Sequence, residues 1–135
     1  MLGLLDIDPA AAAPIWRQIS DGMRRLVASG ALPTGTAVPS VRDLARELRV
    51  NPATVSKAYQ LLVADGALEV RRGEGTFVAE RSRAALEVER ERLLEEAAGR
   101  FAAAARDMGV TRKDAIAAIS AAWRGIDTAA DGGDG

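Results

Sequence analysis

Hydrophobic residues recur every three or four positions along several stretches of the chain, which predicts helices that each bury one face. The first such face consists of Ile15, Ile19, Met23 and Leu26. Pro14 suits the first turn of this helix because its fixed φ angle is already helical. We therefore expect a helix that begins near Pro14 and ends at Gly30, followed by a tight turn in segment 32–35.

Two further helices follow in quick succession. Ser40 and Asp43 form an acidic capping box, which predicts the start of a short helix. The apolar positions of that helix are Val41, Leu44, Ala45 and Leu48. Asn51 is a strong N-cap and Pro52 fits the first helical position, so a new helix is expected there. Two short helices joined by a turn of three or four residues form the outline of a helix-turn-helix.

The helix that begins at Pro52 has two distinct faces. Its predicted buried residues are Val55, Ala58, Tyr59 and Leu62. The opposite face carries Ala53, Ser56, Lys57 and Gln60. These outward residues are small or polar and include one cation. Such a face can enter a DNA groove without bringing a carboxylate against the phosphates.

A β-hairpin is predicted directly after this helix, which Gly66 closes. Segment 68–71 alternates like a strand, and segment 76–78 is rich in residues that favour strands. The turn between them, segment 72–75, contains two glycines. A hairpin in this position is the wing of a winged helix-turn-helix.

The remainder of the chain has a helical pattern from Arg81 to about Met108, and a last helix capped by Thr111. These helices are too long to bury their apolar stripes on a small winged domain, so we expect them to pair two copies of the chain. The expected dimer-interface residues are Leu86, Leu93, Ala97, Phe101, Met108, Ile116, Ile119 and Trp123. The predicted organisation is a winged helix-turn-helix over residues 1–80, a helical dimerisation segment over 81–126 and a disordered tail over 127–135. The predicted fold class is mainly α with one small β-hairpin.

Composition narrows the function further. The chain of 135 residues has no Cys and no His, which removes thiolate nucleophiles, disulfides and the usual zinc ligands. We expect no catalytic residues, no metal site and no cofactor. The start of the chain does not resemble a signal peptide and no apolar stretch could span a membrane, so a cytoplasmic protein is expected. The net charge is −1, with nine basic and nine acidic residues in segment 1–80, so DNA binding requires the fold to gather cations on one face.

Three segments make the prediction more specific. Segments 38–45, 50–59 and 73–78 resemble, in order and spacing, the winged helix-turn-helix of the GntR family of bacterial regulators. The short C-terminal part is similar to the YtrA-type branch of that family. The resemblance implies a homodimeric repressor that binds double-stranded DNA, often encoded beside the transporter genes that it controls.

The resemblance also implies which residues contact DNA. Arg42 matches an arginine that contacts DNA beside the second helix, and Asn51, Thr54 and Lys57 match positions that face the major groove. Gly75 matches the glycine at the tip of the wing. The full set expected at the DNA is Ser40, Arg42, Asn51, Ala53, Thr54, Lys57, Arg71, Arg72, Gly73, Gly75 and Thr76.

Several alternatives stay open at this point. Asn51 has a competing role as an N-cap, and either Arg71 or Arg72 could supply a phosphate contact at the wing. A winged helix that contacts protein instead of DNA is the main rival function, and an enzyme is a weaker one. The sequence leaves open the operator, the regulated genes, the choice between repression and activation, exchange of the C-terminal helices between protomers, and whether a small-molecule effector exists.

Overall fold

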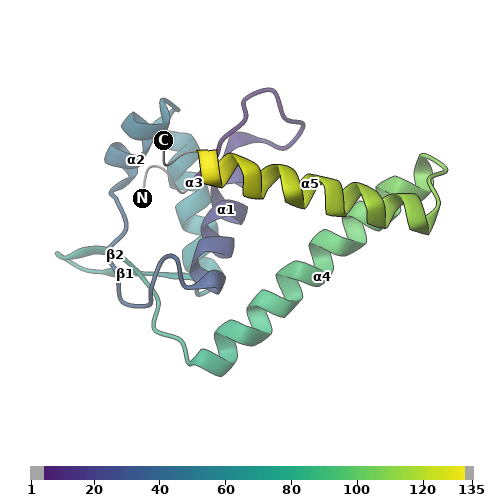
Figure 1. The fold of residues 1–135 in the computed structure, drawn as a ribbon. Helices are drawn as coiled ribbons and strands as arrows, with labels where there is room; N and C mark the ends of the chain where they lie inside the picture. The colour runs from purple at the N-terminus through teal and green to yellow at the C-terminus, as the bar shows by residue number, and fades with distance from the viewer. Residues whose placement is uncertain (1–4, 133–135) are drawn as a thin grey trace. The chain divides into compact units, whose positions relative to one another are not determined.

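The computed structural model describes residues 5–132, and within this range it contains five α-helices and one β-hairpin (Figure 1). The elements are α1 (Ile15–Ser29), α2 (Val41–Leu48), α3 (Pro52–Ala64), β1 (Leu68–Arg71), β2 (Gly75–Val78), α4 (Arg83–Asp107) and α5 (Arg112–Gly132). The predicted fold class, mainly α with one hairpin, is confirmed. The chain forms two compact units, Met1–Arg92 and Leu93–Gly135, so α4 begins in the first and ends in the second.

The predicted starts of the first three helices and the predicted end of the first one are confirmed by the residues that flank them. Pro14 precedes α1, and Gly30 ends it with a left-handed φ of 84°. The Ser40 hydroxyl accepts a hydrogen bond from the Asp43 N–H at 3.1 Å, which starts α2. The Asn51 side-chain oxygen accepts one from the Ala53 N–H at 2.9 Å, which starts α3. The Ser40 and Asn51 caps each satisfy a backbone N–H that has no partner inside its helix.

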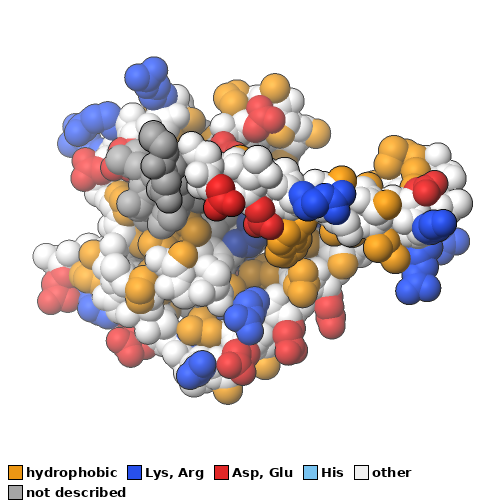
Figure 2. Space-filling model, in the orientation of Figure 1, with side chains coloured by type: hydrophobic (Ala, Val, Ile, Leu, Met, Phe, Trp, Pro, Cys, Tyr) orange, Lys and Arg blue, Asp and Glu red, His pale blue; other side chains and the backbone are white. Residues whose placement is uncertain are grey.

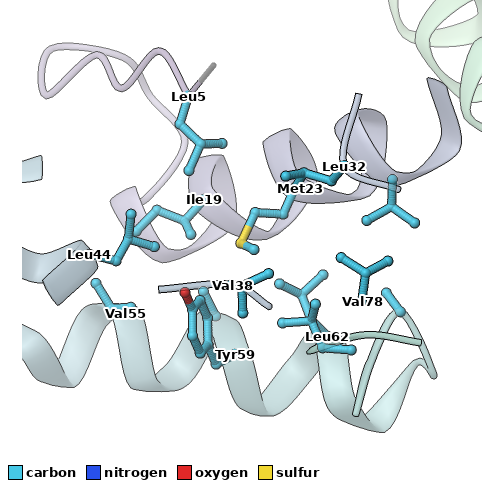
Figure 3. Packing of buried hydrophobic residues seen from close by; sticks show 14 of the residues in the cluster. Leu5, Ile19, Met23, Leu32, Val38, Leu44, Val55, Tyr59, Leu62 and Val78 are labelled. Carbon is cyan, nitrogen blue, oxygen red and sulfur yellow. The ribbon is translucent and has the colours of Figure 1, made fainter. Parts of the chain in front are cut away.

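The core of the first unit lies where α1 packs against α3. Figure 3 shows Ile19 and Met23 of α1 directed toward Tyr59 and Leu62 of α3. Ile19, Met23 and Leu62 are fully buried, and each such side chain stabilises the fold by about 1.5–3 kcal/mol. The buried hydrophobic set of this core is Leu5, Ile19, Met23, Val27, Leu32, Val38, Leu44, Ala45, Val55, Ala58, Tyr59, Leu62, Ala67, Leu68 and Val78.

The hairpin is attached to the rest of the unit through both of its strands. β1 follows α3 and pairs with β2 in an antiparallel register that sets Leu68 opposite Val78. β2 also pairs with the segment before α2, because the Val38 N–H donates to the Thr76 carbonyl at 2.9 Å and the Val78 N–H donates to the Thr36 carbonyl at 2.8 Å. The sequence did not predict this second pairing. It fixes the wing relative to α2 as well as to α3.

The first unit also includes the beginning of α4. Arg81 donates to the backbone carbonyls of Gly66 and Asp65 at 3.2 and 3.3 Å, and Leu86 packs against the core. The backbone carbonyls at the end of α3 thereby gain hydrogen-bond donors. These contacts explain why the compact unit continues to Arg92, past residue 80.

The second unit contains the end of α4 and the whole of α5. Gly109 ends α4 with a φ of 73°, and the Thr111 hydroxyl accepts a hydrogen bond from the Asp114 N–H at 3.2 Å, as the capping pattern predicts. The structure differs from the sequence prediction at the end of α5. This helix continues to Gly132, whereas we expected a disordered tail from residue 127 onward. Alanine favours helix at positions 129 and 130, and the Thr128 hydroxyl donates to the Arg124 carbonyl at 2.8 Å. Residues 133–135 of the predicted tail lie outside the described residues.

Across residues 5–132, the structure contains no helix with the length and apolar character that crossing a membrane requires.

Candidate nucleic-acid interface

The start of α2 presents a cation that makes no ion pair with any of the described residues. Arg42 is exposed and makes no ion pair within residues 5–132. The neighbouring Arg46 is also exposed, but it lies 3.7 Å from the Asp43 carboxylate. The Ser40 oxygen is occupied by its cap, although the hydroxyl proton can still be donated outward. Figure 2 shows Lys and Arg side chains gathered over α2, at the upper left of the view.

The turn between α2 and α3 holds a strained cation. Arg49 has a φ of 58°, and among the described residues it is the only non-glycine residue with a positive φ. Its backbone N–H caps α2 by donating to the Ala45 and Arg46 carbonyls, while its side chain is exposed. The role of Arg49 could not be predicted from the sequence, because the need for a left-handed residue depends on the exact end of α2.

The first half of α3 forms a continuous exposed face. Asn51, Ala53 and Lys57 are exposed, and Thr54 is half-buried beside them. The capping role of Asn51 is confirmed, and its cap uses only the side-chain oxygen, which leaves the amide N–H groups as possible donors. No Asp or Glu occurs anywhere in α3. A helix without carboxylates can approach phosphates without electrostatic repulsion.

Lys57 contacts an aromatic ring on another helix. Its ammonium nitrogen lies 4.2 Å from the centroid of the Trp16 ring, in the first turn of α1. Sequence reasoning missed Trp16 because nothing in the local pattern of α1 indicates that this position lies beside α3. The contact is a cation–π interaction, in which the negative face of the ring attracts the ammonium group.

The two arginines of the wing differ in their surroundings. The Arg71 guanidinium donates to the Glu69 carboxylate at 2.8 and 3.0 Å, and it stacks on Phe77 at 4.1 Å. Arg72 is exposed and makes no ion pair within the described part of the chain. Arg72 is therefore the cation of this hairpin that can reach a phosphate without giving up a partner.

The tip of the wing combines glycine with an unfavourable charge. Gly73 and Gly75 have φ angles of 79° and 124°, which a residue with a Cβ rarely adopts. Glu74 lies exposed between them. Thr76 is half-buried, and its carbonyl is bound by the Val38 N–H.

The residues predicted for the dimer interface lie on α4 and α5. Leu86 packs against the core of its own first unit, and Leu93 is half-buried. In the second unit, Phe101, Ile116 and Ile119 line an apolar groove of about 540 Å³. Ala97 is exposed, and Met108 and Trp123 are 72% and 67% exposed, so large apolar side chains face solvent in the single chain.

Within residues 5–132, no three acidic side chains lie close enough together to hold a metal ion.

The sequence of this chain is similar to those of known bacterial transcription regulators. The model of the family described as "Bacterial regulatory proteins, gntR family" matches residues 16–78. The chain is 41% identical over 83 residues to the HTH-type transcriptional repressor YtrA of Bacillus subtilis, a match that covers 62% of this chain and 64% of that repressor. It is 34% identical over 124 residues to the HTH-type transcriptional regulator YhcF of the same organism, covering 91% of this chain and 95% of YhcF.

Solved structures show the same fold. A GntR family transcriptional regulator from Listeria monocytogenes superposes with a TM-score of 0.69 at 25% identity, and the match covers 84% of this chain and 97% of that one. The similarity therefore includes residues beyond the winged helix-turn-helix.

Proposed function

Because the chain belongs to the GntR family of bacterial transcription regulators and is YtrA-like, we propose that it is a homodimeric repressor of a palindromic operator. The operator would lie near its own gene or near transporter genes, and the protein would act in the cytoplasm. The proposal assigns it no catalytic activity and no cofactor.

The observation that carries this proposal is the exposed face of α3. The face begins at a capped N-terminus, contains no carboxylate and presents Lys57. The N-terminal residues of a recognition helix are those that contact base edges in the major groove. We infer that Asn51, Ala53 and Thr54 approach the bases.

Cations around α3 would hold the protein on the DNA backbone. Arg42 at the start of α2 and Arg72 at the wing are exposed without an ion pair among the described residues. Phosphate contacts of this kind fix the position and orientation of a protein on the duplex. The glycines of the wing would let its backbone approach the adjacent minor groove, with Ser40, Arg71 and Thr76 lying near the phosphates.

The exposed apolar side chains of α4 and α5 support a dimer. Trp123 and Met108 are mostly exposed in one chain, and the apolar groove lined by Phe101 and Ile119 is open. A partner chain related by a two-fold axis would bury these residues. The two copies of α3 would then lie in successive major grooves, about 34–36 Å apart, as a palindromic operator requires.

Gel-shift binding to the region upstream of its own gene, repeated over a salt series, tests this function. We expect tight binding that survives nonspecific competitor DNA and weakens steeply with salt, since phosphate contacts release counterions. Arg42→Ala should weaken that binding, whereas Arg124→Ala, which removes the same charge from α5, should not.

The dimer and the repression are tested separately. Sedimentation should give two chains per particle, and Ile119→Asp should give one chain and weaker operator binding. Deletion of the gene should raise transcription from the promoter that contains the operator. A winged helix used for protein contact would instead show no salt-dependent binding to any duplex, from upstream or genomic DNA, and that outcome would overturn the proposal.

A further inference from the structure

Lys57 is the only cation on the exposed face of α3, and its position is set by a neighbouring helix. Its ammonium nitrogen lies 4.2 Å from the Trp16 ring centroid. Trp16 is half-buried and packs against the core of the first unit, so contact with the core holds its ring in place. The exposed ring face therefore provides a fixed platform for a side chain that would otherwise sample many rotamers.

This contact also sets the direction of the lysine. A lysine that pointed straight out from α3 would meet the base edges on the floor of a major groove. Lys57 instead turns sideways toward the first turn of α1, a different element from the one that enters the groove. The chemistry at the edge of a major groove is phosphate, and a compact ammonium group suits phosphate as a point charge.

The wing contains a second cation held in the same manner. The Arg71 guanidinium lies 4.1 Å from the Phe77 ring centroid, on the other side of the hairpin turn from its own strand. Both pairs join a cation to an aromatic ring on a separate element. This repetition suggests that the fold positions its cations by ring contacts as well as by ion pairs.

We propose that Trp16 is a positioning residue that holds Lys57 for contact with a DNA phosphate at the edge of the major groove. The inference rests on the proposed function, because it requires α3 to enter DNA. It assigns Lys57 to the backbone, and it gives Trp16 on α1 a role in binding although it need not touch DNA.

A double-mutant cycle with Lys57→Met and Trp16→Leu tests the pair. Methionine keeps most of the lysine's apolar stem, and leucine keeps an apolar side chain at position 16. Binding is measured over a salt series with two probes, the upstream duplex and a mixed-sequence duplex of about 30 bp. Lys113→Met is the matched control, because Lys113 is the only other lysine and lies exposed on α5.

We expect Lys57→Met to weaken binding to both duplexes and to reduce the salt slope by about 1, as loss of one phosphate contact predicts. Trp16→Leu should weaken binding by about two- to fivefold, the effect of losing an exposed cation–π contact, and leave the salt slope nearly unchanged. In the Lys57→Met background, Trp16→Leu should have no further effect. Lys113→Met should change neither probe.

Tryptophan emission gives a readout that does not depend on DNA. The chain has two tryptophans, so Trp123→Phe leaves Trp16 as the only one. In that background, Lys57→Met should change the emission of Trp16 because the ammonium leaves its ring. Trp16→Phe serves where Trp16→Leu does not fold, and it should weaken binding less than the leucine variant does.

The outcomes separate this inference from the proposed function. If the wild-type protein binds neither duplex, both the proposed function and this inference are overturned. If it binds and the effects of the two substitutions simply add, Trp16 does not act through Lys57 and only this inference is overturned. The same holds if Lys57→Met weakens binding to the upstream duplex alone, since that result would place Lys57 on a base.

Discussion

A hydrogen bond from the Tyr59 hydroxyl joins α3 to the segment just before α2, and its removal should lower the free energy of unfolding. The Tyr59 hydroxyl on α3 donates to the Pro39 carbonyl at 2.7 Å, and the Tyr59 side chain is 5% exposed. Pro39 directly precedes Ser40, the cap of α2. This hydrogen bond therefore helps to fix the two helices of the helix-turn-helix relative to each other.

Tyr59→Phe removes the hydroxyl and keeps the ring. A neutral hydrogen bond contributes about 0.5–1.5 kcal/mol net, and the half-buried Pro39 carbonyl left without its donor adds to that loss. The ring still fills its site, so no large cavity forms. We expect the free energy of unfolding to fall by about 1–2 kcal/mol.

Urea unfolding at a fixed protein concentration measures this loss. Thr36→Val is the matched control, because the exposed Thr36 hydroxyl also donates to a proline carbonyl, that of Pro33, in the same unit. Loss at an exposed site should stay within about 0.5 kcal/mol. If Tyr59→Phe and Thr36→Val destabilise the protein equally, the Tyr59 hydrogen bond does not hold the two helices together.

Three further predictions concern charge and backbone strain. Burial, and secondarily the Glu47 carboxylate, raise the pKa of Tyr59 above its ordinary value. The free energy of unfolding should therefore keep its full value up to about pH 10 and fall above it. Above that pH the tyrosine of the unfolded chain ionises, whereas the buried Tyr59 of the folded chain resists ionisation. Because the chain has one tyrosine, tyrosinate absorbance should rise together with unfolding, and Tyr59→Phe should remove this pH dependence. Arg49→Gly should raise the free energy of unfolding by up to about 1 kcal/mol, since glycine relieves the left-handed strain, with urea unfolding as the measurement. Glu74→Gln should tighten binding to duplex DNA in gel shifts, most at low salt, because it removes a carboxylate from the wing tip; unchanged affinity would mean that the tip does not approach phosphate.

Much of the fold could be predicted because its signals are local. The caps at Ser40 and Asn51, the break at Gly30 and the glycine turn of the wing each depend on a few adjacent residues. The buried face of α3 follows from helical periodicity alone. Such features are specified within one or two turns of chain, so a single sequence contains them.

The rest depends on residues that are distant in the sequence. The pairing of segment 35–38 with β2 has no local signature, because residues 35–38 do not alternate like a strand. The contact of Lys57 with Trp16 exists only after α1 packs against α3. The end of α5 differs from the prediction for another reason: glycine and acidic residues indicate a tail, but the alanines between them favour helix, which continues to Gly132.

The charges of the candidate site also depend on where the fold places residues, and not on how many of each charge the sequence contains. A count of charges predicts nothing for segment 1–80, because basic and acidic residues are equal in number. The fold separates them: Glu69 is paired with Arg71 on the wing, while α3 contains no carboxylate and Arg42 and Arg72 make no ion pair within the described residues. Coulomb interactions across a few ångströms matter far more than net charge when a helix meets phosphates. A protein with a net charge of −1 can therefore present a cationic surface to DNA, provided that most of its acidic residues are paired or lie on other elements; Glu74 at the wing tip is neither.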